Sequence, residues 1–354
     1  MDRVLAIFMV VTCMASSAMG ATTIYNVMSY GAVGNGRSDD SQVSGNIVAP
    51  VKNAWNGNQR NAWIVFASIR GLVVKGKGVF DGQGPSWWPN KPCYNDPAHG
   101  VFCKGPTAII FRRCDGLRLD GFSKINGPGS HILIMATNDV VVSNLRVIAP
   151  GDSPNTDGID ISSSKNVRIR NSFIGTGDDC IAISAGSSNI DISGITCGPG
   201  HGISIGALGK GGNDIVENVR VRNSTLTRTL TGVRIKTWQG GKGYVRKISF
   251  EGIKFVAVDN PIQIDQFYCP LKVNCQNYTS TVAISDVSFR AISGTSTAES
   301  VINLMCSQSV GCTNIKLDRV YISSSTPGKK VHASCFNAHG TATHSKPAIK
   351  CLLR

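Results

Sequence analysis

Four short clusters of polar residues in the middle of the chain have the residue types and spacing for acid–base chemistry. Asn155-Thr156-Asp157 is followed by Gly177-Asp178-Asp179, then by Gly200-His201-Gly202 and by Arg234-Ile235-Lys236. Successive clusters are separated by 21, 22 and 33 residues (157 to 178, 179 to 201 and 201 to 234). If the chain coils with a repeat of that size, the clusters stack on one face. That would place paired carboxylates beside a cationic patch, as hydrolysis of an acidic sugar polymer would require.

Each cluster taken alone has a simpler interpretation. An aspartate beside a glycine usually makes local hydrogen bonds in a turn, and a histidine between two glycines is more often a turn or buried residue than a catalyst. Arg234 and Lys236 point to the same face of a strand, where solvated cations are common. The functional interpretation depends on the combination. Crowded carboxylates raise one another's pKa, so one can stay protonated while its neighbour is ionised, and paired cations can bind a sugar carboxylate.

The composition limits the classes of protein and partner. A chain of 354 residues with 42% hydrophobic residues can build a sizeable core in one or two domains. The net charge of +14 favours a polyanionic partner, although a basic protein adapted to an acidic medium is nearly as good an interpretation. No dense Lys/Arg run with interleaved aromatic residues occurs, so we expect no nucleic-acid partner.

Residues 1–20 have the pattern of a secretory signal peptide. Arg3 precedes an apolar run from Val4 to Val11, and Ala18-Met19-Gly20 supplies small residues at a cleavage site. The apolar run is too short to span a membrane, so we expect no membrane association once it is removed. The sequence therefore predicts a secreted mature chain, residues 21–354, that forms a single domain.

Cysteine usage agrees with secretion, because disulfides are the default state of secreted cysteines. The chain has twelve cysteines, and Cys13 falls in the predicted signal peptide. Five close pairs are favoured, although sequence alone leaves their connectivity open: Cys93/Cys103, Cys180/Cys197, Cys269/Cys275, Cys306/Cys312 and Cys335/Cys351. Cys114 is left over. Asn223-Ser224-Thr225 and Asn277-Tyr278-Thr279 are N-glycosylation sequons, which also occur by chance.

A degenerate repeat organises most of the chain. Its core is two aliphatic or aromatic residues separated by one residue, usually polar, from Leu117-Arg118-Leu119 through Val167-Arg168-Ile169 to Ile315-Lys316-Leu317. Earlier copies are expected at Leu72 and Ile47. Such alternation predicts short strands, and the Asn/Gly/Ser clusters between copies predict turns. Strands at this spacing favour an all-β, single-stranded parallel β-helix, and a β-sandwich is the weaker alternative.

At its polar clusters the chain resembles the plant polygalacturonases, the pectin-degrading enzymes of glycoside hydrolase family 28. The four clusters match the motifs of that family in order. The supporting matches are Tyr30-Gly31-Ala32-Val33, Asp81-Gly82-Gln83-Gly84 with Trp87-Trp88, the stretch 197–206, and Asp265-Gln266-Phe267-Tyr268-Cys269. The resemblance covers almost all of the mature chain. It implies a right-handed parallel β-helix of the pectin-lyase type that hydrolyses α-1,4 bonds of galacturonan with inversion.

The resemblance also implies catalytic roles. Asp178 would be the general acid that protonates the leaving oxygen. Asp157 and Asp179 would hold and activate the water, and an inverting pair needs carboxyl groups about 6.5–9.5 Å apart to leave room for it. His201 would support the protonation state of the acid.

Substrate binding is implied at four further residues. Arg234 and Lys236 would bind the galacturonate carboxylate at the cleavage point, Asn155 would help to position the substrate, and Tyr268 would line the same subsite. The resemblance implies no metal and no cofactor. We expect a monomer in the cell wall that acts on polygalacturonate.

The chain departs from the family between Gln42 and Val43. Relatives follow the stretch 39–42 with a helix, a strand and a cysteine pair, whereas this chain continues directly with Val43-Ser44-Gly45. A solenoid needs a cap over its last coil, which otherwise exposes stacked apolar side chains. The sequence therefore predicts an internal deletion that truncates the N-terminal cap and leaves the catalytic coils intact.

Other functions fit parts of the pattern. A pectate lyase is also a β-helix but uses Ca²⁺ and elimination, and a relative could cut rhamnogalacturonan or a substituted pectin. A non-catalytic cell-wall protein that binds polyuronide would need only the positive charge. Sequence leaves endo or exo action open, because that depends on the loops at the ends of the groove.

Overall fold

The computed structural model describes residues 42–55, 61–88, 105–269, 275, 278–279 and 281–354. The predicted signal peptide, the pair Cys93/Cys103 and most of the region before the predicted deletion lie outside the described residues. Those predictions therefore stay predictions.

One parallel sheet contains ten strands of the described residues, and every strand between the two ends pairs with the strands of the coils before and after it. In order along the sheet these strands are β3 (Ala62–Ala67), β6 (Thr107–Arg112), β9 (Ile132–Met135), β12 (Ile159–Ser162), β15 (Ile181–Ile183), β18 (Ile203–Leu208), β20 (Thr231–Thr237), β22 (Asn260–Asp265), β24 (Ser300–Met305) and β26 (His332–Phe336). We call this the ten-stranded sheet.

Seventeen described strands form the second parallel sheet, which bends around the rest of each coil. Its strands are β1 (Gln42–Val43), β2 (Asn46–Val48), β4 (Val73–Gly76), β5 (Val79–Asp81), β7 (Arg118–Asp120), β8 (Ser123–Ile125), β10 (Asn138–Ser143), β11 (Arg146–Ile148), β13 (Lys165–Arg170), β14 (Phe173–Gly175), β16 (Ser187–Ser193), β17 (Thr196–Cys197), β19 (Asn213–Thr227), β21 (Lys242–Val258), β23 (Ala283–Ser296), β25 (Cys312–Ser324) and β27 (Ala338–Thr343). The described part of the chain adds two short 3₁₀ helices, η2 (Lys52–Ala54) and η3 (Gly84–Ser86).

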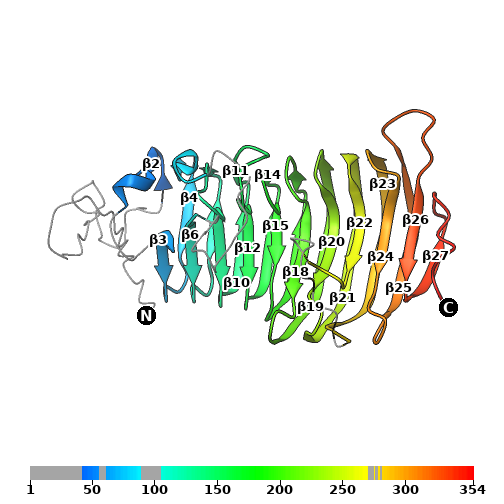
Figure 1. Cartoon of the computed structure of the whole chain (residues 1–354). Helices are drawn as coiled ribbons and strands as arrows, with labels where there is room; N and C mark the ends of the chain where they lie inside the picture. Colours follow the sequence, from blue (N-terminus) through cyan, green and yellow to red (C-terminus); the bar gives the residue numbers. More distant parts are fainter. Residues whose placement is uncertain (1–41, 56–60, 89–104, 270–274, 276–277, 280) are drawn as a thin grey trace.

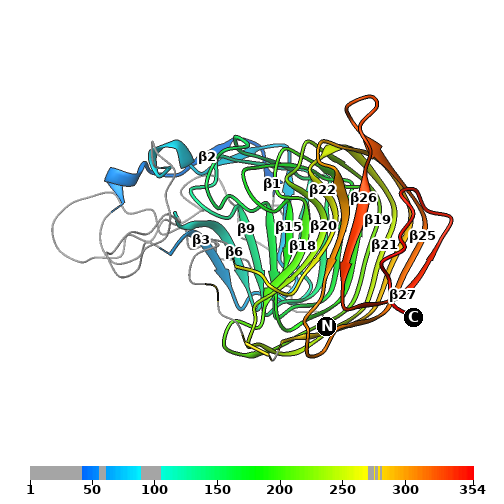
Figure 2. The same cartoon turned by 45° about the vertical axis from the view of Figure 1, so that its right-hand side comes forward.

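The coils stack in chain order along one axis, so the chain is a right-handed parallel β-helix as the sequence predicts. Figure 1 shows the coils following one another from β3 near the N-terminal end to β27 at the C-terminal end. Figure 2 shows that the two sheets enclose a common interior. Parallel strands of neighbouring coils lie about 4.8 Å apart, so residues one coil apart in sequence become neighbours on the same face.

The predicted repeat occupies one stack of the seventeen-stranded sheet. The middle residues of its copies are in register, because Arg118 pairs with Val141, Val141 with Arg168, and the series continues to Ser288 and Lys316. The copy at Leu72 also fits, since Val73 pairs with Arg118. The expectation for Ile47 is wrong: Ile47 pairs with Phe80 and belongs to the neighbouring stack. Both stacks alternate apolar and polar residues, so the pattern alone cannot tell one side of a coil from the next.

Ladders of aliphatic side chains fill the interior. In the ten-stranded sheet one ladder runs through Ile132, Ile159, Ile181 and Ile203, all of which are fully buried. Isoleucine suits these positions because its β-branched side chain packs well on a pleated surface. Each buried side chain of this size contributes about 1.5–3 kcal/mol of hydrophobic stabilisation, and the same ladder fixes the register of the polar residues next to it.

Four of the five predicted disulfides are present in the described residues: Cys180–Cys197, Cys269–Cys275, Cys306–Cys312 and Cys335–Cys351. Cys114 is a free, fully buried thiol whose pKa is raised chiefly by burial. The described residues contain no helix with the length and apolar character to cross a membrane.

Candidate active site

The fold places Asp157, Asp179 and His201 at equivalent positions of three successive coils. Ile159 pairs with Ile181 and Ile181 with Ile203, and each of the three polar residues lies two positions before its isoleucine. The step is 22 residues both times (157 to 179 and 179 to 201). The stacking predicted from sequence spacing is therefore what the strand register produces.

Asp179 is at the centre of an ion-pair network on the outward face. Its carboxylate is 1% exposed and accepts hydrogen bonds from Ser204 Oγ (2.8 Å), Arg234 Nη2 (2.8 Å) and Lys236 Nζ (2.9 Å). Arg234 also donates from Nε to Ser204 Oγ at 3.1 Å. Strand pairing positions this network, because Ser204 on β18 is directly opposite Arg234 on β20. A buried carboxylate is tolerated only when it is paired and hydrogen-bonded in this way.

Asp178 and His201 form a second pair, which is open to solvent on one side. His201 Nδ1 lies 3.0 Å from Asp178 Oδ1, and the same oxygen accepts the backbone N–H of Asp179 at 2.8 Å. The side chain of His201 is 34% exposed and that of Asp178 is 23% exposed, so a ligand can reach both. The backbone of His201 is held by its own N–H to the Asp178 carbonyl and by the hydroxyl of Thr231.

The pKa of Asp178 lies below its ordinary value, opposite to the direction expected from crowded carboxylates. Burial opposes ionisation most strongly, but the hydrogen bond from His201, the charges of His201 and Lys236, and the Asp179 amide together outweigh it. The crowding argument fails because Arg234 and Lys236 neutralise the nearest carboxylate, that of Asp179. Nearby charge therefore favours the ionised form of Asp178.

Two positioning residues have no obvious sequence signal. Ser204 bridges Asp179 and Arg234, but a serine within a strand is common. His131 is fully buried and donates its backbone N–H (2.8 Å) and its Nδ1–H (3.1 Å) to the backbone carbonyl of Asp157. Its Nε2 accepts the N–H of Gly127 at 3.0 Å, which defines the neutral tautomer. Burial lowers the pKa of His131 to about 3, so this histidine stays neutral and holds the segment that carries Asp157.

Tyr268 contacts the network through Lys236, and Asn155 lies on the coil that carries Asp157. Lys236 Nζ lies 5.4 Å from the centre of the Tyr268 ring, and that ring meets Trp238 edge-on at 5.2 Å. A cation over an aromatic face is attracted to it, so Tyr268 helps to hold the Lys236 ammonium. Asn155 lies in the turn before β12 with left-handed backbone (φ 52°), a conformation that asparagine adopts more readily than most residues.

A metal ion does not suit this donor set. Atoms of Asp178, Asp179 and His201 lie within 4.8 Å of one another and could in principle hold a cation. Both oxygens of Asp179 already accept hydrogen bonds from Arg234 and Lys236. A dication bound here would stand beside two positive side chains, so the cluster fits an acid–base site better than a metal site.

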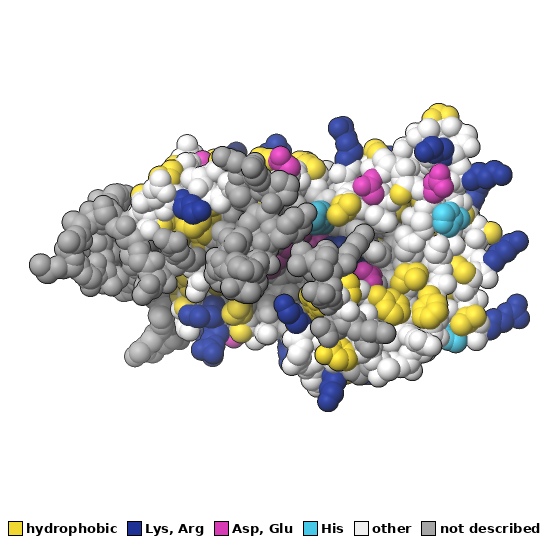
Figure 3. Space-filling model, viewed as in Figure 1, with side chains coloured by type: hydrophobic (Ala, Val, Ile, Leu, Met, Phe, Trp, Pro, Cys, Tyr) yellow, Lys and Arg dark blue, Asp and Glu magenta, His cyan; other side chains and the backbone are white. Residues whose placement is uncertain are grey.

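Figure 3 shows acidic, histidine and basic side chains close together in the middle of one face, over β15, β18 and β20. Hydrogen bonds and ion pairs join five of the predicted residues into one cluster: Asp178, Asp179, His201, Arg234 and Lys236. Tyr268 contacts it through Lys236, and Asp157 lies one coil before Asp179.

A parallel β-helix with paired carboxylates, a histidine and two cations on one face defines a class of polysaccharide-processing proteins, and the sequence comparisons name the family. The family model described as "Glycosyl hydrolases family 28" matches residues 28–346. The chain belongs to this family of pectin-degrading glycoside hydrolases.

Individual relatives agree. A probable polygalacturonase of Arabidopsis thaliana is 46% identical over 316 residues, covering 88% of this chain and 67% of the relative. A polygalacturonase of Cryptomeria japonica is 38% identical, covering 94% of this chain and 73% of the relative. Among solved structures, an exopolygalacturonase of Thermotoga maritima matches with a TM-score of 0.72 and 20% identity, over 87% of this chain and 79% of that one.

Proposed function

We propose that the chain is a secreted polygalacturonase that hydrolyses α-1,4 bonds of galacturonan in the cell wall by an inverting mechanism. The observation that best supports the proposal is the pairing of an accessible Asp178–His201 hydrogen bond with the Asp179–Arg234–Lys236 network on the same face. Four disulfides among the described residues fit an extracellular protein. We further propose that it acts as a monomer.

The binding step uses the two cations. The bonds to Asp179 and Ser204 engage two of the five N–H groups of Arg234 and one of the three of Lys236. Further donors can therefore reach a galacturonate carboxylate without breaking the network. Tyr268 and Asn155 would complete the subsite.

In the chemical step the carboxylates would have different roles, according to their surroundings. Asp178, hydrogen-bonded to His201, would protonate the leaving oxygen. Asp157 and Asp179 would position the attacking water.

Substrate binding itself would adjust the acid. The positive charge of Lys236 is one of the causes that lower the pKa of Asp178. A substrate carboxylate placed on Lys236 cancels that charge, so the pKa of Asp178 rises on binding and the protonated acid becomes more populated. The proton would then reside where the leaving oxygen needs it.

Product analysis on polygalacturonate tests the function. The wild-type chain should release reducing ends, and Asp178→Asn should lose activity by several orders of magnitude. Monomer as the sole product means exo action, and mixed oligomers mean endo action. Undiminished turnover by Asp178→Asn would remove Asp178 from its role, and products with ultraviolet-absorbing double bonds would point to a lyase instead.

A non-catalytic polyuronide-binding protein is the second candidate, because the net charge of +14 alone would attract the polymer. It predicts salt-sensitive binding to pectate without release of reducing ends.

A further inference from the structure

The ten-stranded sheet continues past the cluster and carries an exposed apolar patch on the same outward face. Lys236 pairs with Asp265, Asp265 with Met305, and Met305 with Phe336. Phe267 follows β22, and its ring lies 6.1 Å from that of Phe336. We call Phe267, Met305 and Phe336 the apolar patch; their side chains are 36%, 37% and 43% exposed. Figure 3 shows hydrophobic side chains gathered over β24 and β26.

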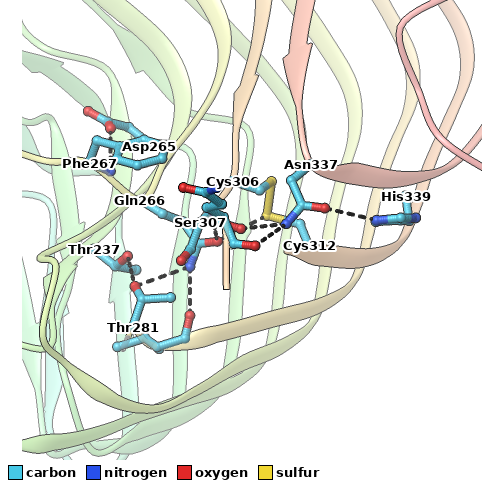
Figure 4. The surroundings of a disulfide bond; sticks show 12 residues. Thr237, Asp265, Gln266, Phe267, Thr281, Cys306, Ser307, Cys312, Asn337 and His339 are labelled. Carbon is cyan, nitrogen blue, oxygen red and sulfur yellow. Dashed lines mark hydrogen bonds between the residues drawn. A yellow bond between two sulfur atoms is a disulfide. The ribbon is translucent and has the colours of Figure 1, made fainter. Parts of the chain in front are cut away.

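The backbone under the patch is firmly held. Gln266, just before Phe267, is fully buried and donates to the Val282 carbonyl (2.7 Å), while its Oε1 accepts the N–H of Ser307 (2.9 Å). Figure 4 shows Gln266 extending toward Ser307 while Phe267 and Asp265 lie together on the other side. Met305 is followed directly by the disulfide Cys306–Cys312. Side chains held on a rigid frame make a better binding surface than side chains on a loose loop.

The charge changes along the row of outward-facing residues that runs from Lys236 through Asp265 and Met305 to Phe336. Arg234 and Lys236 favour a negatively charged sugar, but the next position holds the acid Asp265 and the two after it are apolar. An ionised carboxylate over Met305 would lose water against an apolar surface and face a carboxyl group nearby, which is unfavourable. A methyl ester at the same place carries no charge and adds apolar surface that the patch can cover.

We propose that the apolar patch is a subsite for an uncharged, methyl-esterified galacturonosyl unit of the polymer whose free carboxylate binds at Arg234 and Lys236. Since neighbouring strands lie about 4.8 Å apart, a chain that follows the helix axis from Lys236 reaches Met305 after about 10 Å and Phe336 after about 14 Å. The patch would thus select partly esterified pectin over fully de-esterified pectate. The inference rests on the proposed function and adds a preference to it.

The test measures binding separately from turnover. In the Asp178→Asn background, calorimetry compares unesterified and methyl-esterified oligogalacturonides of equal length. Phe336→Ala and Met305→Ala should each weaken binding of the esterified oligomer about three- to tenfold. Each should change the affinity for the unesterified oligomer by less than about twofold. Tyr321→Ala removes a 50%-exposed ring from β25 of the other sheet and should change neither, which makes it the matched control.

Other outcomes would overturn the proposal. Equally weakened binding of both oligomers, or unchanged binding of both, means that the patch does not distinguish esterified from unesterified galacturonate. Self-association that Phe336→Ala abolishes, with unchanged oligomer binding, assigns the patch to a second copy of the chain. In the active background, the ratio of kcat/KM on esterified pectin to kcat/KM on pectate should fall with Phe336→Ala. Absence of hydrolysis by the wild-type chain would instead reject the proposed function, and the binding ratio would still decide the role of the patch.

Discussion

Removing the hydroxyl of Ser204 should loosen Arg234 and take one of several hydrogen bonds from Asp179. Ser204 is fully buried; its Oγ donates to Asp179 at 2.8 Å and accepts from Arg234 Nε at 3.1 Å. Ser204→Ala leaves the Arg234 Nε–H without this acceptor at a mostly buried position. Hydrogen bonds to charged groups contribute about 1.5–3 kcal/mol each, and burying an unpaired donor costs a similar amount.

The expected loss in free energy of unfolding is therefore about 1.5–3 kcal/mol. At about 2 °C per kcal/mol for a large domain, the thermal midpoint should fall by roughly 3–6 °C. Because Arg234 is proposed to bind the substrate carboxylate, KM on polygalacturonate should rise by about tenfold, and kcat should change less. Circular dichroism melts and initial rates over a range of substrate concentrations measure both effects.

Ser187→Ala is the matched control. Ser187 is also a strand serine, 1% exposed, but its hydroxyl is buried without a hydrogen-bond partner among the described residues. Replacing an unpaired buried hydroxyl should be neutral or stabilising. If Ser204→Ala and Ser187→Ala shift the midpoint and KM equally, the bridging role of Ser204 is refuted.

Three further outcomes follow from the geometry. His201→Ala removes the main influence that lowers the pKa of Asp178, so the Asp178 carboxyl should titrate at higher pH by infrared difference spectroscopy. A carboxyl group whose pKa is lower in the folded than in the unfolded state stabilises the fold at pH values above its unfolded pKa, and this stabilisation is lost in acid. The destabilisation caused by His201→Ala should therefore shrink as the pH falls through the folded pKa. Lys124 is fully buried, with its pKa lowered to about 7 by burial; the unfolded chain binds its proton up to about pH 10. Lys124→Met should therefore raise the thermal midpoint below pH 7, with the gain disappearing toward pH 10. Ile203→Ala should cost about 2–5 kcal/mol by opening a gap in the ladder, measured by denaturant unfolding against the exposed Val256→Ala.

The fold was predictable because coil structure follows from local alternation. Each triple such as Val167-Arg168-Ile169 places two apolar side chains inward and one residue outward, and the parallel register then aligns the triples. The wrong expectation for Ile47 also comes from the local nature of this pattern. Ile47 has the same pattern as Leu72 but pairs in another stack, since alternation says which residues point inward and not which side of the coil they line.

The sequence predicts which residues come together in the site. It predicts less well which of them pair and how the pairing shifts their pKa values. Coil spacing brings Asp157, Asp179 and His201 into line. Arg234 and Lys236 both pair with Asp179 because of the directions in which their side chains point across the neighbouring strands. The spacing of residues in the sequence does not determine those directions. The pKa of Asp178 is lowered mainly by its hydrogen bond to His201 and the charge of His201, and less by Lys236, so the sequence argument from crowding gave the wrong direction.

The predicted loss of the N-terminal cap can be tested independently of the site. Each coil of a solenoid contacts only its neighbours, and the catalytic cluster lies just before β15 and β18 and on β20, several coils from β3. Inserting the missing helix, strand and cysteine pair between Gln42 and Val43 should therefore raise the thermal midpoint and the secreted yield. The kcat/KM on polygalacturonate should stay within about twofold, because the added coil does not reach Asp178. Equal midpoints and equal secretion of the two chains would refute the predicted loss of the cap. A large gain in kcat/KM would show instead that the N-terminal coils contribute to the groove, and that the coils are less independent than the solenoid argument requires.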